Sequence, residues 1–264
     1  MQTKWTAERI KGLKGTGKIT CLTAYDYTTA KLIDAAGIHL ALVGDSLANT
    51  MLGHPTTLAV TMEQMLHHTA AVSRGITNAL VVADMPFMSY QVSTEKALEN
   101  AGRFLKEAGA GAVKIEGGAF RAQTVAALVA NGIPVLGHIG LTPQSIRQTG
   151  YKVRGRKTCE AESLVLDAKA LEAAGVFGIV IECVPAALSK DITKAVRIPT
   201  IGIGAGPDCD GQILVTHDLL GLSGHATPKF VKRYAELGDL MVQAFKEYKA
   251  EVESGSFPSG EYGY

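Results

Sequence analysis

Acidic side chains directly follow several short apolar runs of the chain, at positions where they could bind a metal ion or move a proton. These residues are Asp45, Asp84, Glu116 and Glu182. In a parallel α/β fold the carboxyl ends of the strands meet at one edge, which would bring the four side chains together. A single acid in a loop is about as often a solvated surface charge as a functional residue. Four acids that converge, however, repel one another unless a cation or a lysine balances their charge. Carboxylate oxygens are ligands that hard cations prefer, and Mg²⁺ is the first candidate among these cations.

Lys114 and Glu116 lie two residues apart in the run AVKIEGG, so on a strand their side chains face the same way. Their neighbours Val113 and Ile115 would then face the covering helices. The two charged side chains would face the interior, where they need partners. One interpretation is a buried ion pair that closes the barrel. In the other interpretation, which we favour, Glu116 binds the metal ion and Lys114 contacts the substrate.

Glu182 follows the apolar run GIVI directly, on the same side of the strand as Val180. If the earlier strands hold the metal, Glu182 lies across the mouth, where a partly desolvated carboxylate could act as a base. The alternative is a further acid in the metal site, or an acid that only makes hydrogen bonds. His138 ends another apolar run, and it could bind the substrate or merely satisfy a nearby carbonyl.

Short apolar runs alternate with amphipathic stretches along the chain, a pattern typical of parallel strands covered by helices. Thr61 and Gln64 have capping-box spacing at the start of one such helix. The helical stretch 120–131 stops at Gly132, and the stretch 162–175 ends at Gly175, as helices often do. A further helical stretch is 93–110. The apolar runs are 19–26, 40–46, 79–87, 112–118, 133–143, 177–185 and 198–206.

Seven predicted strands fit either a barrel or an open doubly wound sheet, and we favour the barrel. The sequence does not decide where the eighth strand lies, because residues 211–221 could form this strand or could form a helix with Asp210 as N-cap. The 264 residues suit a barrel of the TIM type, which needs roughly 250. We therefore predict an α/β protein with a (β/α)8 TIM-type barrel, an N-terminal helix closing its bottom and extra C-terminal helices. Residues 1–264 are expected to form a single domain.

The composition argues against several classes of protein. A net charge of +1 leaves no basic surplus for nucleic acid. No apolar run approaches the roughly 20 residues of a membrane span, and the polar N-terminal segment lacks the apolar core of a signal peptide. The four cysteines form no C-x-x-C pair, so they suggest neither a zinc site nor a redox motif, and they fit reduced thiols in the cytoplasm.

Two further segments give weaker signals. GIGAG (202–206) lacks the spacing of a dinucleotide fingerprint and comes late in the chain, so a tight backbone turn is the favoured interpretation. YKVRGRK (151–157) is expected to be a mobile surface loop, with a lid or a docking strip for an acidic cofactor tail as the alternative.

Several segments together resemble those of the ketopantoate hydroxymethyltransferase family, in the phosphoenolpyruvate mutase-like group of barrels. The most specific of them, in chain order, are VGDS, KIEGG and GHIGLTPQS. TAYDYTTAKLIDAAG, ADMPFMSY, GYKVRGR and DGQILVTHDLLG match as well. The similarity runs from about Lys18 to VESGSFP near the C-terminus. Small departures at Ala48, Pro55 and Ala59 affect a loop and none of the metal or catalytic positions.

The resemblance implies an enzyme, a one-carbon transferase. Its reaction would transfer a hydroxymethyl group from 5,10-methylenetetrahydrofolate to 3-methyl-2-oxobutanoate through a Mg-stabilised enolate. The product would be 2-dehydropantoate, for pantothenate and coenzyme A synthesis. One Mg²⁺ per subunit would be held by Asp45, Asp84 and Glu116, with Glu182 as the base. The expected substrate-binding residues are Asp45, Ser46, Asp84, Lys114 and His138.

The resemblance also implies a cytoplasmic homodecamer. Its expected partners are small molecules, the 2-oxo acid and the folate, and it is expected to bind neither nucleic acid nor a membrane. Two rival functions stay open beside it. A lyase or mutase could use the same site on a different oxo acid, and a test of cleavage would reveal it. A non-catalytic protein could have kept the barrel, in which case Mg²⁺ would not bind.

Overall fold

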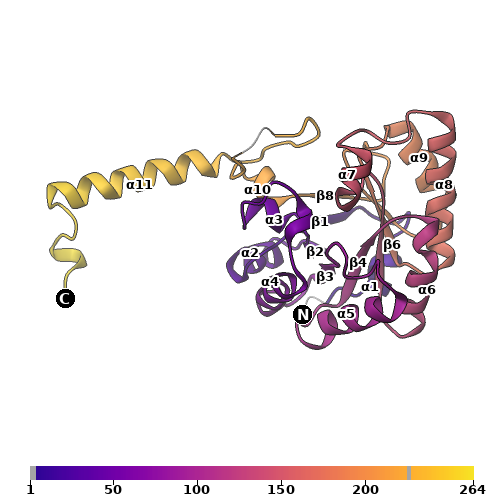
Figure 1. Cartoon of the computed structure of the whole chain (residues 1–264). Coiled ribbons are helices and arrows are strands. Elements are labelled where there is room, and N and C mark those ends of the chain that lie inside the picture. The colour runs from indigo at the N-terminus through magenta and orange to yellow at the C-terminus, as the bar shows by residue number, and fades with distance from the viewer. Residues whose placement is uncertain (1–3, 225–226) are drawn as a thin grey trace. The chain divides into compact units, whose positions relative to one another are not determined.

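The computed structural model describes residues 4–224 and 227–264 and shows a closed barrel of eight parallel strands (Figure 1). Each strand pairs with the next in chain order, and β8 closes the ring by pairing with β1. The predicted (β/α)8 barrel is therefore confirmed, and the open doubly wound sheet is wrong. The strands are β1 Ile19–Thr23, β2 Leu40–Val43, β3 Leu80–Asp84, β4 Ala112–Glu116, β5 Val135–Gly140, β6 Gly178–Glu182, β7 Thr200–Ile203 and β8 Gly211–Leu214.

Helices connect the strands and lie around the outside of the barrel (Figure 1). Short 3-10 turns precede some of them: η1 Thr57–Ala59, η2 Ala119–Arg121 and η3 Pro143–Ser145. The α-helices of this part are α1 Ala7–Lys11, α2 Tyr27–Ala35, α3 Leu47–Thr50, α4 Met62–Gly75, α5 Thr94–Lys106, α6 Ala122–Ala130, α7 Ile146–Thr149, α8 Thr158–Ala173 and α9 Ala186–Ala195.

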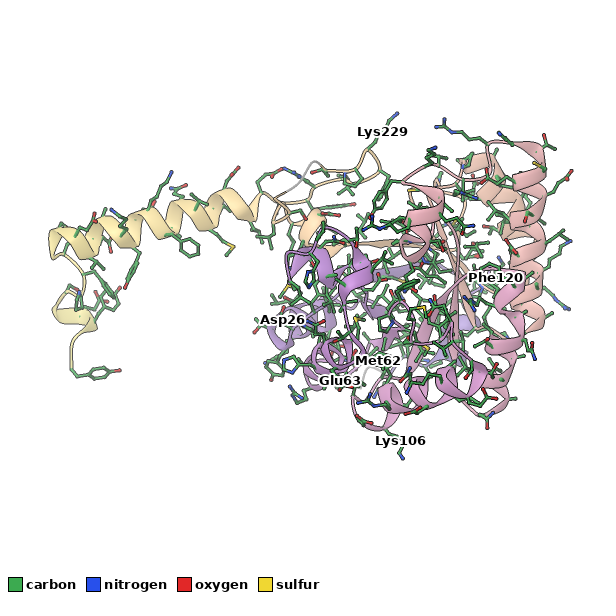
Figure 2. The ribbon with its side chains drawn as sticks, viewed as in Figure 1. Asp26, Met62, Glu63, Lys106, Phe120 and Lys229 are labelled. Carbon is green, nitrogen blue, oxygen red and sulfur yellow. The ribbon has the colours of Figure 1, made fainter. Side chains whose placement is uncertain are left out.

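The starts of several helices follow from local capping residues. The predicted capping box of α4 is present, because Thr61 and Gln64 each accept the other's backbone N–H. Asp26, labelled in Figure 2, caps α2 by accepting the N–H of Thr29 at 2.9 Å. Helix α8 begins at Thr158, ahead of the predicted start at residue 162. Glu160 in its first turn lies near the positive end of the helix dipole, which favours this earlier start.

The inside of the barrel is filled at the amino ends of its strands by an apolar cluster that includes Leu136, Val180 and Ile201. Ile10 of α1 belongs to the same cluster and is fully buried, so α1 closes the bottom of the barrel as predicted. Outward-facing side chains of the strands, such as Val113, pack with the helices in a second cluster. The predicted alternation along β4 is therefore confirmed.

The connection between β7 and β8 is short and contains no helix. Gly206 in this connection has a φ of +82°, and a Cβ there would lie 2.5 Å from the Cβ of Ala186. The tight-turn interpretation of GIGAG is therefore confirmed. Asp210 does not cap a helix. Its carboxylate accepts hydrogen bonds from Thr200 N at 2.8 Å and from Lys14 Nζ at 2.8 Å, which ties the segment before β1 to the start of β8.

Residues 215–264 form a second compact unit, which contains α10 Thr216–Leu219, α11 Leu237–Ser254 and η4 Gly260–Tyr262. The extra C-terminal helices are therefore confirmed. The segment 211–221, for which the sequence allowed a strand or a helix, contains both a strand and a short helix. Every residue from Asp239 to Ser254 is exposed. In the described parts of the chain, no helix is long and apolar enough to cross a membrane. The single-domain organisation stays a prediction.

A candidate metal and acid–base site at the carboxyl ends of the strands

Three of the four predicted acids form one buried cluster. Asp45 follows β2, Asp84 ends β3 and Glu116 ends β4, and each is at most 4% exposed. One oxygen atom from each of the three carboxylates can be chosen so that all three lie within 4.8 Å of one another. The backbone N–H of Asp45 also donates to Asp84 Oδ2 at 3.2 Å. Parallel neighbouring strands thus bring together residues that are 39 and 32 positions apart in the chain (84 − 45 and 116 − 84).

Lys114 lies beside this cluster on β4 and faces the same interior as Glu116. Its Nζ lies 2.7 Å from both carboxylate oxygens of Asp84 and 3.5 Å from Glu116 Oε1. Burial would lower the pKa of Lys114, but the negative charges of Asp84, Glu116 and Asp45 outweigh it and raise the pKa. The lysine is therefore held as a cation, and the buried ion pair that the sequence left as one alternative is present.

One lysine does not balance three buried carboxyl groups. Burial, and then the charges of Asp84 and Glu116, raise the pKa of Asp45 well above its usual range. Burial also raises the pKa of Asp84, although Lys114 opposes the shift. Burial would raise the pKa of Glu116 as well, but Lys114 and then His138 lower it. Excess negative charge among hard oxygen donors is what a bound divalent cation would relieve, so these residues fit a metal ion.

Glu116 supports the same conclusion by its geometry. Within the described ranges, its Oε1 atom is buried and makes no hydrogen bond, whereas Oε2 accepts the backbone N–H of Gln144 at 3.0 Å. A buried oxygen without a partner is costly unless a positive charge lies against it. The Oε1 atom has Lys114 Nζ and His138 Nδ1 at 3.5 Å each, so a cation would have to share it with these two groups.

The fourth acid, Glu182, ends β6 and lies apart from the three-residue cluster. His138 of β5 lies between them, with Nδ1 3.5 Å from Glu116 Oε1 and Nε2 3.2 Å from Glu182 Oε2. Burial would lower the pKa of His138, but the two carboxylates raise it to about 9. The histidine therefore faces carboxylates, not the local carbonyl that was its alternative role. Glu182 is the more open of the two acids, with 16% of its side chain exposed against 2% for Glu116.

Ser46, a predicted substrate-binding residue, follows Asp45 and is half-buried. Its Oγ lies 2.7 Å from the hydroxyl of Tyr25, a fully buried residue that follows β1. Burial raises the pKa of Tyr25 to about 12, so the phenol stays protonated and can hydrogen bond to Ser46. Sequence reasoning did not single out Tyr25, because a tyrosine after a strand carries no charge signal.

Gln144 is a second residue that sequence reasoning missed. It lies in η3, after β5, and is 5% exposed. Its side-chain Nε2 donates to Asp45 Oδ2 at 3.0 Å and to the carbonyl of Met85 at 2.9 Å. A neutral glutamine carries no charge that would mark it as a site residue, although Gln144 lies within the specific segment GHIGLTPQS.

The segment 151–157, expected to be a mobile surface loop, is tied to the end of β6. The N–H of Arg154 donates to the carbonyl of Cys183 at 2.9 Å, and the N–H of Gly155 donates to Glu160 Oε2 at 2.7 Å. Arg154 also pairs with Glu160 at 2.7 Å. Tyr151 at the start of the segment remains 63% exposed. The centre of this segment is thus anchored, while its start faces solvent.

Comparison with known proteins gives consistent results. Residues 4–260 match the family described as Ketopantoate hydroxymethyltransferase. The 3-methyl-2-oxobutanoate hydroxymethyltransferase of Clostridium novyi (strain NT) is 59% identical over 246 residues, 93% of this chain and 90% of the relative. The protein of that name from Syntrophus aciditrophicus (strain SB) is 55% identical over 263 residues, 99% of this chain and 97% of the relative.

Solved structures with much lower sequence identity share the fold. The phosphoenolpyruvate phosphomutase of Streptomyces platensis subsp. rosaceus is 14% identical with a TM-score of 0.63, over 95% of this chain and 88% of that one. A phosphonopyruvate hydrolase, solved in complex with oxalate and Mg²⁺, is 14% identical with a TM-score of 0.63, over 97% and 93%. These likenesses support the barrel alone. Because the family match spans nearly the whole chain and the relatives are more than half identical, the chain belongs to the ketopantoate hydroxymethyltransferase family, whose members are transferases.

Proposed function

We propose that this protein transfers the one-carbon unit of 5,10-methylenetetrahydrofolate to 3-methyl-2-oxobutanoate and so yields 2-dehydropantoate, in the synthesis of pantothenate and coenzyme A. The C3 carbon of the oxo acid loses a proton and bonds to the methylene carbon. Water supplies the hydroxyl oxygen, and tetrahydrofolate leaves. The observation that carries the proposal is the buried cluster of Asp45, Asp84 and Glu116, with Glu182 as a separate, more open acid beyond it.

Asp45, Asp84 and Glu116 would hold one Mg²⁺ per subunit. When bound, the ion would supply positive charge against the keto oxygen as C3 is deprotonated. The excess of buried negative charge supports a cation at this place, and so does Glu116 Oε1, a buried oxygen that accepts no hydrogen bond. Asp45 and Asp84 would also shape the part of the site that receives the oxo acid.

Lys114, Ser46 and His138 would contact the oxo acid. Lys114 is held as a cation, so it adds positive charge where negative charge develops on the substrate. Ser46, whose Oγ is positioned by the hydroxyl of Tyr25, would bind the carboxylate of the oxo acid. His138 would bind the substrate and keep Glu182 in place, because its Nε2 lies 3.2 Å from Glu182 Oε2.

Glu182 would be the base that removes the C3 proton. It comes from β6, whereas the three metal ligands follow β2, β3 and β4, so the base and the ligands come from different parts of the barrel rim. Its partial exposure leaves room for a substrate atom beside it. A general base must reach the proton that it abstracts, and a carboxylate at a strand end of the mouth meets this condition.

Deuterium exchange tests the first chemical step without the folate. The protein is incubated with 3-methyl-2-oxobutanoate and Mg²⁺ in D₂O, and the C3 proton signal of the oxo acid is followed by NMR. Loss of the signal that stops when a chelator is added supports metal-assisted deprotonation of this substrate. No exchange, either alone or with tetrahydrofolate present, would contradict the proposed substrate and favour a lyase or mutase.

We also propose that the protein works in the cytoplasm as a homo-oligomer, a decamer by its family resemblance. The exposed apolar side chains of α11, which include Leu240, Phe245 and Tyr248, support association, because several large apolar side chains exposed on one helix are costly in water. Light scattering coupled to size-exclusion chromatography measures the mass directly. A mass equal to one chain of 27.8 kDa at micromolar concentration would contradict the oligomer.

A further inference from the structure

We infer that Gln144 is a positioning residue that fixes the orientation of the acids in the metal site. Its carboxamide is buried and makes four hydrogen bonds. The Nε2 group donates to Asp45 Oδ2 at 3.0 Å and to Met85 O at 2.9 Å. The Oε1 atom accepts from the hydroxyl of Tyr90 at 2.7 Å and from Gln91 Nε2 at 3.1 Å. The inference rests on the metal site of the proposed function.

The chemistry of these partners allows the carboxamide only one of its two orientations. The carbonyl of Met85 and the carboxylate of Asp45 are acceptors, so the NH₂ group must face them. The Tyr90 hydroxyl and the Gln91 amide can donate from the other side. A reversed carboxamide would place its oxygen against two acceptors in a buried site and leave both without a donor. Gln144 is therefore locked with its donors toward Asp45.

Gln144 also contacts a second metal ligand through its backbone, because its N–H donates to Glu116 Oε2 at 3.0 Å. One residue thus binds one oxygen of Asp45 and one oxygen of Glu116. The other oxygens, Asp45 Oδ1 and Glu116 Oε1, take no hydrogen bond from Gln144, so a cation would bind there and would share Oε1 with Lys114 and His138. Pro143 precedes Gln144 in η3 and restricts the local backbone, which helps to hold the N–H in place.

The consequence is that Asp45, with Oδ2 held by Gln144, would offer its other oxygen to a metal ion. Groups that hydrogen bond to metal ligands orient those ligands, and their loss costs 10–100-fold in metal affinity or activity. Without the Gln144 donor, which now holds Oδ2, Asp45 could rotate, bind through both oxygens or turn away. Gln144 would therefore affect metal binding without being a ligand.

Binding of Mn²⁺, measured by electron paramagnetic resonance, tests this role without any turnover. The Gln144→Met variant keeps the length of the side chain and removes its hydrogen bonds. The matched control is Gln148→Met, because Gln148 is an exposed glutamine one helical turn further along. We expect the Kd for Mn²⁺ to rise about 10–100-fold in Gln144→Met and the zero-field splitting of the bound ion to change. Both should stay as in the unchanged protein in Gln148→Met.

A second variant keeps the test decisive if Gln144→Met does not fold, as judged by circular dichroism. Tyr90→Phe keeps the aromatic ring and removes the hydroxyl that donates to the carboxamide at 2.7 Å and contacts the backbone of Glu116 at a longer 3.3 Å. It should raise the Kd about 2–10-fold. A Kd within twofold of the original and an unaltered spectrum in folded Gln144→Met, or in Tyr90→Phe if only that variant folds, would overturn the inference. Failure of the unchanged protein to bind Mn²⁺ would instead overturn the metal site of the proposed function.

Discussion

The Nζ atom of Lys114 lies 2.7 Å from both carboxylate oxygens of Asp84, and both side chains are buried at the carboxyl ends of adjacent strands. The contact follows from the register of the sheet, in which these two residues are direct Cα partners. A buried charge pair of this kind is seldom a net source of stability, but breaking it leaves a buried charge without compensation.

Lys114→Met should therefore destabilise the metal-free protein by about 3–5 kcal/mol. Urea denaturation in the presence of chelator measures the change. The control is Lys106→Met, because Lys106 is exposed at the end of α5 (Figure 2) and its replacement should change the stability by no more than about 0.5 kcal/mol. Equal effects of the two substitutions would mean that the Lys114–Asp84 pair is not needed to compensate the buried acids.

Asp45→Asn should have opposite effects with and without metal. The pKa of Asp45 is raised by burial and by Asp84 and Glu116, so its ionised form costs stability in the metal-free protein at neutral pH. Asparagine removes that charge and keeps an oxygen that can accept from Gln144. Thermal unfolding in chelator should thus show the variant to be at least as stable as the original.

With Mg²⁺ at about 100 times its Kd, the original protein should gain about 2.7 kcal/mol, and Asp45→Asn should lose most of this gain. Asp191→Asn, at an exposed position of α9, is the control and should keep it. A full Mg²⁺ gain in Asp45→Asn would remove Asp45 from the metal ligands.

Glu182→Gln should lower the rate of C3 deuterium exchange by about 10²–10⁴-fold, because the amide cannot take the proton. Binding of Mg²⁺ and of the oxo acid, followed by calorimetry, should stay nearly unchanged, since glutamine keeps the size of the side chain. Glu162→Gln, on the exposed side of α8, serves as the control. Weakened Mg²⁺ binding with the rate restored by excess metal would instead assign Glu182 to the metal site.

Asp34 should stabilise the fold in a pH-dependent way. Its carboxylate accepts the backbone N–H groups of Thr77, Asn78 and Ala79, and so ties the end of α2 to the start of β3. Partial burial would raise its pKa, but these hydrogen bonds outweigh it and lower the pKa. Asp34→Ala should therefore cost about 1 kcal/mol at pH 7, because solvent screens the hydrogen bonds of this partly exposed carboxylate.

The sign of the pH dependence follows from the lowered pKa. The contribution of Asp34 is complete above the pKa of about 3.9 of an unfolded aspartate and is lost as the pH falls through the lower value of the folded state. Urea denaturation at several pH values should show a constant penalty for Asp34→Ala between pH 7 and 5. A penalty that grows as the pH falls below 4 would contradict the hydrogen-bonded carboxylate.

Local patterns in the sequence determined the elements and the identity of the charged residues. Thr61 and Gln64 predicted the start of α4, because a capping box needs only residues three apart in the chain. The alternation along β4 predicted that Lys114 and Glu116 face inward, because side chains on a strand alternate with a period of two. The candidate metal ligands were found in the same way, since each ends or follows a buried strand.

Only the tertiary structure decided how the sheet ends meet and how the site is supported. Closure by β1 and β8 depends on pairing across the whole chain, and the segment 211–221 divides into a strand and a short helix where that pairing stops. The contacts of Gln144 with Asp45, of Tyr25 with Ser46 and of His138 with Glu182 join residues that no local pattern relates. Hydrogen bonds between neutral or distant side chains depend on distance in space, and sequence periodicity does not encode that distance.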